Sequence, residues 1–447
     1  MKGTAQGQAP GPRGEPGALG DAPARRAQRA VVAVAFLNLA LSQGIHQAFP
    51  LFYVSMLEDF GWSRAATAGV FSLSMLIIGG TGPLVGWGLQ QLGARRWLSL
   101  GAAALAAGLA ATSRVHSGLG LYLSYGGLAA LGLAALGWSV HGAVLTAWFQ
   151  HHRGTVTAIA YSGMGLGAMA MAPLAQALID RVGWRGALLA LAGAVCLLAA
   201  PNLALMRDPP PAAGAARQKE RPVGAGAALR AAVATPAFWY GFAGFFFVAV
   251  SSFSVAPHQA AVLVDAGFST GVAAGVVAAV GLLSFAGRLL FGWMSDRYGH
   301  VASATASSLL SALGTAALLV MAWHPHGALV ALYALGFGLG FGTRMPVMAS
   351  LAAAKFGGPN FGVIFGAMSL GHGAGGAVGP WLAGWLFDVT GSYRWMFVYA
   401  TVAALVAAAS IAAAERRPGL EGRGAGRGQP PGRRVSAGAA GGPQGRG

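Results

Sequence analysis

The sequence predicts an all-α membrane protein in which twelve transmembrane helices form two pseudo-symmetric six-helix bundles. Three observations lead to this class: few charges, regularly spaced apolar runs, and features that recur at a nearly constant offset. Of the 447 residues, 55% are hydrophobic and only 9% are charged, whereas soluble globular proteins carry roughly 25% charged residues. Most of the surface is therefore not in contact with water.

The apolar runs have the length of membrane-spanning helices. A bilayer core of about 30 Å needs roughly 20 residues at a rise of about 1.5 Å each, and such runs follow one another from Ala30 to about Ala414. We expect a first set of spans at about 31–57, 65–90, 97–113, 118–149, 155–180 and 186–206. A second set is expected at about 238–263, 270–295, 301–322, 327–352, 358–385 and 394–414.

The segments outside these spans are polar, basic or rich in Gly and Pro, a composition that cannot bury enough apolar surface to fold. The first apolar run is too long for a cleavable signal peptide, and further spans follow it. The chain is therefore expected to consist of a disordered tail (1–30), an N-terminal bundle (31–206), a cytoplasmic linker (207–237), a C-terminal bundle (238–414) and a basic tail (415–447).

Lys and Arg residues predict the orientation, because they are enriched on the cytoplasmic side of membrane proteins. With both tails cytoplasmic, 22 of the 29 lie inside. Two fall within spans, and five lie outside, namely Arg64, Arg114, Arg181, Arg185 and Arg394. The net charge of +17 is therefore expected to face anionic lipid of the inner (plasma) membrane rather than nucleic acid.

An internal repeat supports the division into halves. The segment Gly86–Gly93 (GWGLQQLG) follows the second span, and Gly292–Gly299 (GWMSDRYG) follows the eighth, 206 positions later. Pro173 and Pro380 lie in glycine-rich spans and are 207 positions apart. Matching features at almost one offset indicate two duplicated halves.

Duplicated six-helix halves with a Gly-x-x-x-Asp-Arg-x-Gly loop resemble the major facilitator superfamily. The loop is well formed in the second half, at Gly292, Asp296, Arg297 and Gly299. In the first half, Gln90 and Gln91 replace the Asp-Arg pair. The resemblance implies a cytoplasmic gate formed by the four residues of the second half, and a simple turn in the first.

Three segments have a narrower resemblance, to the monocarboxylate transporters and the related oxalate/formate antiporters. They are Gly44–Arg64, Trp148–Gly167 and the stretch GRLLFGWMSDR that begins at Gly287. The resemblance implies that Arg288 is the substrate-binding arginine of the eighth helix. Leu51 stands where animal members carry a lysine, and Ser284 where they carry an aspartate, so their scheme of proton coupling does not transfer directly.

Arg288 and Arg344 are the two cations within predicted spans. Arginine keeps its proton, and its planar guanidinium binds a carboxylate with two hydrogen bonds. Because a charge within the bilayer is costly unless it faces a cavity or a partner, we expect Arg288 to bind an anionic substrate. Arg344 is expected either to line the same pocket or to act as a gate residue, and Ser284 to lie beside Arg288.

Histidines and one glutamine are the other polar groups expected to act within the spans. Only histidine titrates near neutral pH without perturbation, so His258, His46 and His141 are candidates for proton coupling, and His258 also for substrate binding. Gln47 is expected to bond a hydroxyl or keto oxygen of the substrate or a neighbouring helix.

The sequence thus predicts a secondary transporter of small organic anions, working as a monomer by proton symport or by anion exchange. Two alternatives stay open: an exporter of amphipathic compounds, and a membrane sensor without transport. A single cysteine, Cys196, and the absence of nucleotide-binding or metal-binding motifs predict no cofactor, no metal and no enzymatic activity.

Overall fold

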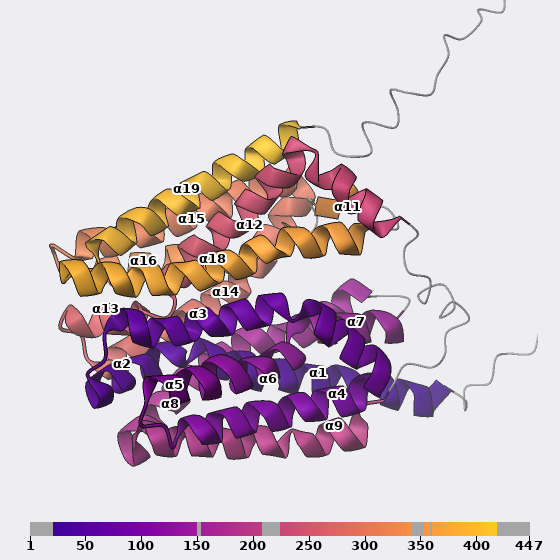
Figure 1. Cartoon of the computed structure of the whole chain (residues 1–447), viewed down its shortest axis with the longest axis horizontal. Coiled ribbons are helices and arrows are strands. Elements are labelled where there is room, and N and C mark those ends of the chain that lie inside the picture. Colours follow the sequence, from indigo (N-terminus) through magenta and orange to yellow (C-terminus); the bar gives the residue numbers. More distant parts are fainter. Residues whose placement is uncertain are drawn as a thin grey trace, which may run out of the picture.

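The computed structural model describes residues 21–149, 153–207, 224–341 and 360–417, together with residues 348, 352, 353 and 355–357. Throughout these residues the regular elements are helices (Figure 1). Both described chain ends lie at one end of the molecule. We call the opposite end the distal face; it carries the turns near residues 61, 267 and 391.

The first half contains α1 to α9 and the second half α11 to α19. The helices of the first half are α1 (Asp21–Gln47), α2 (Phe49–Phe60), α3 (Arg64–Gly80), α4 (Gly82–Thr112), α5 (Gly118–Leu121), the π-helix η1 (Tyr122–Ala129), α6 (Ala130–Ala135), α7 (Trp138–Trp148), α8 (Arg153–Leu197) and α9 (Ala199–Leu205). Those of the second half are α11 (Ala225–Val233), α12 (Pro236–Val255), α13 (Gln259–Asp265), α14 (Thr270–Tyr298), α15 (His300–Met321), α16 (Gly327–Phe341), α18 (Phe361–Thr390) and α19 (Arg394–Arg416).

The helices follow the predicted spans, with breaks that the span pattern did not show. Within the described part of the chain, eight helical stretches are long and apolar enough to cross a membrane, and the bent pair α3 and α4 adds a ninth. The predicted second and third spans meet at Gly93 within α4, and the fifth and sixth meet at Gly183 within α8. The tenth predicted span begins with the shorter α16 and runs beyond the described residues.

Two predicted boundaries differ from the structure. The helix α1 begins at Asp21, within the tail expected to be disordered. Ala, Arg and Gln favour helix in this stretch, and Pro23 is tolerated in a first turn. The linker also contains a helix, α11, because its Ala-rich sequence has high helix propensity.

The repeat seen in the sequence has a counterpart in the backbone. Gly93 and Gly299, 206 positions apart, both have positive φ with an extended ψ (73° and 166°; 91° and 157°). On the distal face, Gly61 and Gly267, also 206 apart, both have positive φ. Glycine adopts this conformation without the steric penalty of a side chain. The two halves therefore turn at equivalent positions.

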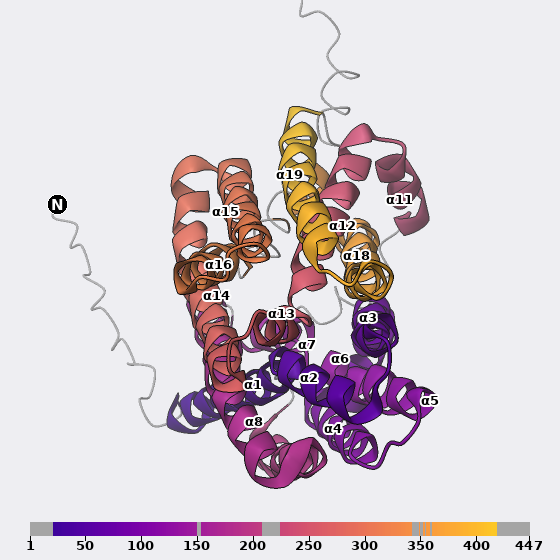
Figure 2. The ribbon, with the colours of Figure 1, turned by 90° about the vertical axis from the view of Figure 1, so that its left-hand side faces the viewer.

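Among the described helices, the halves meet mainly along two pairs, α3 with α18 and α8 with α14, as seen from the distal face in Figure 2. A Cβ atom on Gly79 would lie 2.8 Å from the Cα of Gly373, and one on Gly281 would lie 2.8 Å from the Cβ of Ala168. Small residues let membrane helices approach closely, and this packing holds them together. The contact between the halves is therefore close, and α2 and α13 cover it at the distal face.

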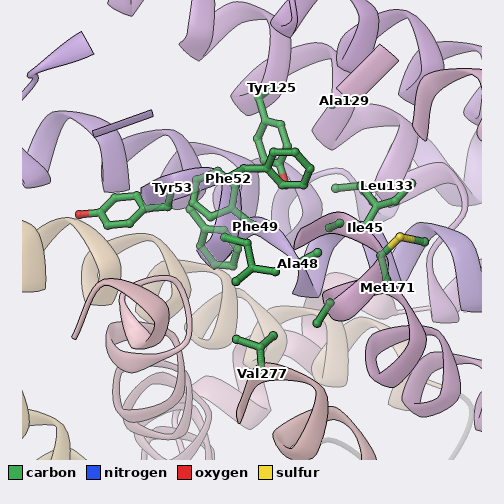
Figure 3. Packing of buried hydrophobic residues seen from close by; sticks show 14 of the residues in the cluster. Ile45, Ala48, Phe49, Phe52, Tyr53, Tyr125, Ala129, Leu133, Met171 and Val277 are labelled. Carbon is green, nitrogen blue, oxygen red and sulfur yellow. The ribbon is translucent and has the colours of Figure 1, made fainter. Parts of the chain in front are cut away.

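The first half has an aromatic core that reaches the second half. Phe49 and Phe52 of α2 lie against Tyr125 of η1 (Figure 3), with ring centroids of Phe49 and Tyr125 5.0 Å apart. Val277 of α14 borders the same cluster. The break between α1 and α2 at Ala48, with Pro50 in the first turn of α2, places these rings between the halves.

Replacing Gly167 by Ala is expected to destabilise the protein by about 1–3 kcal/mol, as overpacking does in a closely packed site. The added Cβ would lie 2.0 Å from the carbonyl oxygen of Ala40 in α1, so one helix must move. Gly193→Ala in the same helix is the matched control, because nothing lies within 4 Å of its added Cβ. Thermal unfolding in detergent measures both variants, and an equal effect of the two would contradict the packing argument.

Candidate functional site

The distal face is closed by contacts between the N-terminal end of α3 and the second half. The backbone N–H groups of Arg64 and Ala65 each donate to one carboxylate oxygen of Asp388, both at 2.8 Å. The first N–H groups of a helix have no partner within the helix and favour a negative charge. A carboxylate at the end of α18 thus caps a helix of the other half. A Cβ on Gly384 would lie 2.6 Å from Ala65 N, so α18 passes directly against this helix end.

The Arg64 side chain makes a second set of contacts with the second half. Its guanidinium lies 2.8 Å from a carboxylate oxygen of Asp265 and donates a hydrogen bond to the Tyr393 hydroxyl. It also stacks over the Phe387 ring, 3.9 Å from the centroid. The Arg64 side chain is 17% exposed and that of Asp265 40%, so solvent weakens the ion pair, whereas the contacts with Phe387 and Tyr393 are better shielded.

His258 continues this network into the protein interior. It is fully buried in the break between α12 and α13, with Nε2 3.0 Å from the Pro380 carbonyl oxygen and Nδ1 3.2 Å from the Tyr393 hydroxyl. A carbonyl only accepts, so Nε2 carries the proton and Nδ1 accepts from Tyr393. Burial raises the pKa of the Tyr393 phenol, so this hydroxyl keeps the proton that it donates.

Tyr53 of α2 completes the arrangement. Its hydroxyl lies 3.3 Å from the Arg64 carbonyl oxygen, and its ring packs edge-on against the imidazole of His258 with centroids 5.0 Å apart. We call the set of side chains that joins the halves here the distal lock: Tyr53, Arg64, His258, Asp265, Asp388 and Tyr393.

Arg288 lies away from the distal lock, on the face of α14 that borders the first half. Gly281 and Phe285 of this face meet Ala168 and Gly165 of α8, and Arg288 follows Phe285 by three residues, one turn further along the same helix face. It is half-buried. Ser284 is buried, and its hydroxyl donates to the Gly281 carbonyl oxygen of its own helix at 2.8 Å. Arg344 lies outside the described residues.

His46 lies at the end of α1 with its ring stacked on Phe71 of α3, centroids 4.8 Å apart. Phe71 contacts Phe253 of the second half, 6.1 Å between centroids, so one ring separates His46 from that half. The His46 side chain is 6% exposed, and neither ring nitrogen has a hydrogen-bonding partner among the described residues. Gln47 is half-buried and is the last residue of α1.

The other predicted residues lie apart from these groups. His141 is buried in α7, with Nδ1 bonded to the Gly137 carbonyl oxygen of its own helix at 3.0 Å. Gly292, Asp296 and Arg297 lie near the C-terminal end of α14, and Gly299 caps it. Asp296 and Arg297 are exposed. Within the described part of the chain, no group of three or more His, Cys, Asp and Glu could hold a metal ion.

Comparison with known proteins identifies the family. A model described as Major Facilitator Superfamily matches residues 32–343 and 260–439. Monocarboxylate transporter 11 of Homo sapiens is 30% identical over 391 residues, which cover 82% of this chain and 79% of that protein. This chain belongs to the major facilitator superfamily, in its monocarboxylate transporter branch. Monocarboxylate transporter 3 of Rattus norvegicus is 28% identical over 383 residues, with 83% and 76% covered.

Solved structures confirm the major facilitator fold class predicted from the sequence. The nucleoside transporter NupG has a TM-score of 0.73 at 13% identity, covering 87% of this chain and 99% of its own. A bacterial homolog of the human lysosomal transporter Spinster, in an inward-facing and unoccupied conformation, has a TM-score of 0.70 at 16% identity, with 87% and 97% covered. At these identities the likeness concerns the fold alone. As a member of the monocarboxylate transporter branch, the chain is a membrane transporter and not an enzyme.

Sequence reasoning missed the distal lock. The sequence predicts only an outer positive charge at Arg64, and no motif in it indicates a role for Asp265, Asp388 or Tyr393. The sequence contained one signal: an acidic residue stands at the distal end of two spans of the second half, opposite an arginine that begins a span of the first. A single sequence does not reveal that residues 324 positions apart are in contact.

Proposed function

We propose that this monocarboxylate transporter homologue is a secondary transporter of small organic anions, which works as a monomer by alternating access. Its substrate carboxylate binds Arg288. Coupling is by proton symport or by exchange of one anion for another. The chain ends lie in the cytoplasm of a cell whose inner (plasma) membrane holds the protein, and the distal lock faces outward.

The position of Arg288 carries this proposal. It continues the stripe of α14 that meets α8 of the other half, so a ligand held by its guanidinium lies between the two halves. A ligand at such a site becomes accessible from either side when the halves rock about it. None of the twelve Asp and Glu residues lies in the body of a predicted span, so the charge on this arginine favours an anionic substrate over a cationic one.

His46 is the group in the first half best suited to contact the substrate or its proton. A neutral imidazole has one donor and one acceptor, and burying either without a partner costs roughly 1–3 kcal/mol. A ligand that enters between the halves would supply the partner. Gln47, next to His46, is the proposed second hydrogen-bonding group.

The variant His46→Phe tests this role, because it keeps the ring stacked on Phe71 and removes both nitrogens. It is expected to unfold at the same temperature as the parent or a higher one, since the buried polar atoms are gone, while uptake of the acid is lost. Thermal unfolding and uptake are measured on the same preparation. Unchanged uptake would show that His46 serves only in packing.

Uptake into liposomes by the purified protein tests the proposed function. Labelled lactate, pyruvate, formate, oxalate and succinate are offered with and without an inward proton gradient, and with and without unlabelled acid inside. Stimulation by the gradient indicates symport, and stimulation by internal acid indicates exchange. Folded protein that moves none of these acids would contradict the proposal and leave export of amphipathic compounds or a sensing role.

A further inference from the structure

The distal lock contains one histidine, the residue type whose unperturbed charge changes near neutral pH, and the hydrogen bonds of the lock have a fixed direction. Arg64 donates to the Tyr393 oxygen, Tyr393 donates to Nδ1 of His258, and Nε2–H of His258 donates to the Pro380 carbonyl oxygen. While His258 is neutral, each donor in this chain meets an acceptor. The chain runs from the first half, through Tyr393, into the break between α12 and α13.

We propose that His258 is the proton-coupling residue and that it acts through the distal lock: a proton bound at Nδ1 opens the distal face. This inference rests on the proposed function in taking the distal face as the outer one. It assigns the proton to a site separate from Arg288. His258 is thus a positioning residue for the closed state and not a contact of the substrate.

Protonation at Nδ1 changes the lock in two ways. First, Nδ1 becomes a donor, so the Tyr393 hydroxyl must turn its own hydrogen away from His258. Its oxygen then has to accept from both Arg64 and His258. Second, a positive charge appears beside the guanidinium of Arg64, joined to it through a single hydroxyl. Like charges repel, and a buried site screens them less than water does. Both changes oppose the contact between Arg64 and the second half.

The charged and titratable groups around His258 come from every element packed against it. Tyr53 comes from α2, Arg64 from α3, Asp265 from the end of α13 and Asp388 from the end of α18, and Tyr393 precedes α19. Neither carboxylate is within hydrogen-bonding distance of the imidazole; both are bonded to Arg64 or to the N-terminal end of α3. The proton on His258 therefore has no carboxylate partner while the lock is closed.

The experiment measures opening of the distal face without any substrate. Cys196→Ser removes the single cysteine, and spin labels are attached at His116→Cys and His324→Cys. These positions are exposed, and they lie beyond the distal ends of α4 in one half and α15 in the other. Distances between the labels are recorded by double electron–electron resonance in lipid nanodiscs at about pH 7.5 and about pH 5.5, on either side of the usual range for histidine.

The parent is expected to shift toward longer distances at the lower pH, with the ratio of open to closed molecules rising about fivefold or more, the usual range of coupling between two sites. His258→Gln is expected to show the same distances at both pH values. Tyr393→Phe keeps the ring under Arg64 and removes the hydroxyl, so the open component is expected at both pH values. A parent without a pH response, or a response that His258→Gln retains in full, would overturn the proposal.

A transport readout separates coupling from a purely structural role. In liposomes, the parent is expected to take up acid faster when an inward proton gradient is imposed, whereas His258→Gln is expected to take it up at one rate with and without the gradient. If the protein moves no carboxylate at all while the distances still respond to pH through His258, the proposed substrate is wrong and the proton-sensitive lock stands. If acids are transported and His258→Gln keeps the stimulation, the lock proposal is wrong and the transport function stands.

Discussion

Arg288→Ala is expected to lower saturable uptake of the transported acid by at least about 30-fold. Truncating one partner of a buried, hydrogen-bonded charge pair costs about 2–5 kcal/mol, and each 1.4 kcal/mol corresponds to a factor of about ten in affinity. The loss should appear at low substrate concentration first, because the removed group binds the ground state. Initial rates over a range of concentrations, measured in liposomes, separate the effect on affinity from that on turnover.

Two further variants define what Arg288 contributes. Arg288→Lys keeps the charge but not the planar pair of donors that a carboxylate matches, so an intermediate rate is expected. Arg230→Ala is the matched control: Arg230 is exposed on α11 in the same half and bonds a carbonyl of its own helix. Equal uptake by Arg288→Ala and the control would place the anion site elsewhere.

Arg64→Ala is expected to open the distal face at neutral pH, without acidification. The variant loses the hydrogen bond to Tyr393, the stacking on Phe387 and the pair with Asp265. A hydrogen bond to a charged group contributes about 1.5–3 kcal/mol, which corresponds to about a 10- to 100-fold rise in the ratio of open to closed molecules. The partly exposed ion pair between Arg64 and Asp265 adds little to this loss of free energy. Label distances across the distal face at neutral pH measure the ratio.

Arg185→Ala is the control for this variant, because it breaks an ion pair on the same face without touching the second half. Arg185 lies 2.5 Å from a carboxylate oxygen of Asp59 and stacks over Trp184, both within the first half. The label distances across the distal face of Arg185→Ala should match those of the parent. If both variants open the distal face to the same extent, the loss of a surface charge explains the result, and the contacts of Arg64 with the second half do not.

The fold could be predicted because its signals are local. Span length, the loop glycines and the repeated prolines each depend on residues near one another in sequence, and the bilayer makes the apolar pattern strong. The break at Ala48 had a local signal as well, Pro50, but a run of apolar residues on both sides of it hid the interruption.

The candidate site was predictable only in part, since its residues act through long-range contacts. An arginine within a span is visible in the sequence, so Arg288 could be named. The sequence indicates His258 as a group that can titrate, but the hydrogen bonds of His258 to Tyr393 and Pro380 connect residues 135 and 122 positions apart. Whether a histidine has hydrogen-bonding partners also depends on tertiary packing. His258 has two such partners, whereas the ring nitrogens of His46 have none among the described residues.

The carboxylate of Asp388 completes the hydrogen bonding of the N-terminal end of α3 in the closed state. Of the N–H groups that open α3, those of Arg64 and Ala65 are bonded by Asp388, while Ser63 of the same half bonds those of Ala66 and Thr67. When the halves part, water replaces Asp388 at the N–H groups of Arg64 and Ala65, so both donors keep a hydrogen-bonding partner in either state. Opening therefore exchanges hydrogen bonds with Asp388 for hydrogen bonds with water. A gate of this kind combines a stable closed state with rapid opening.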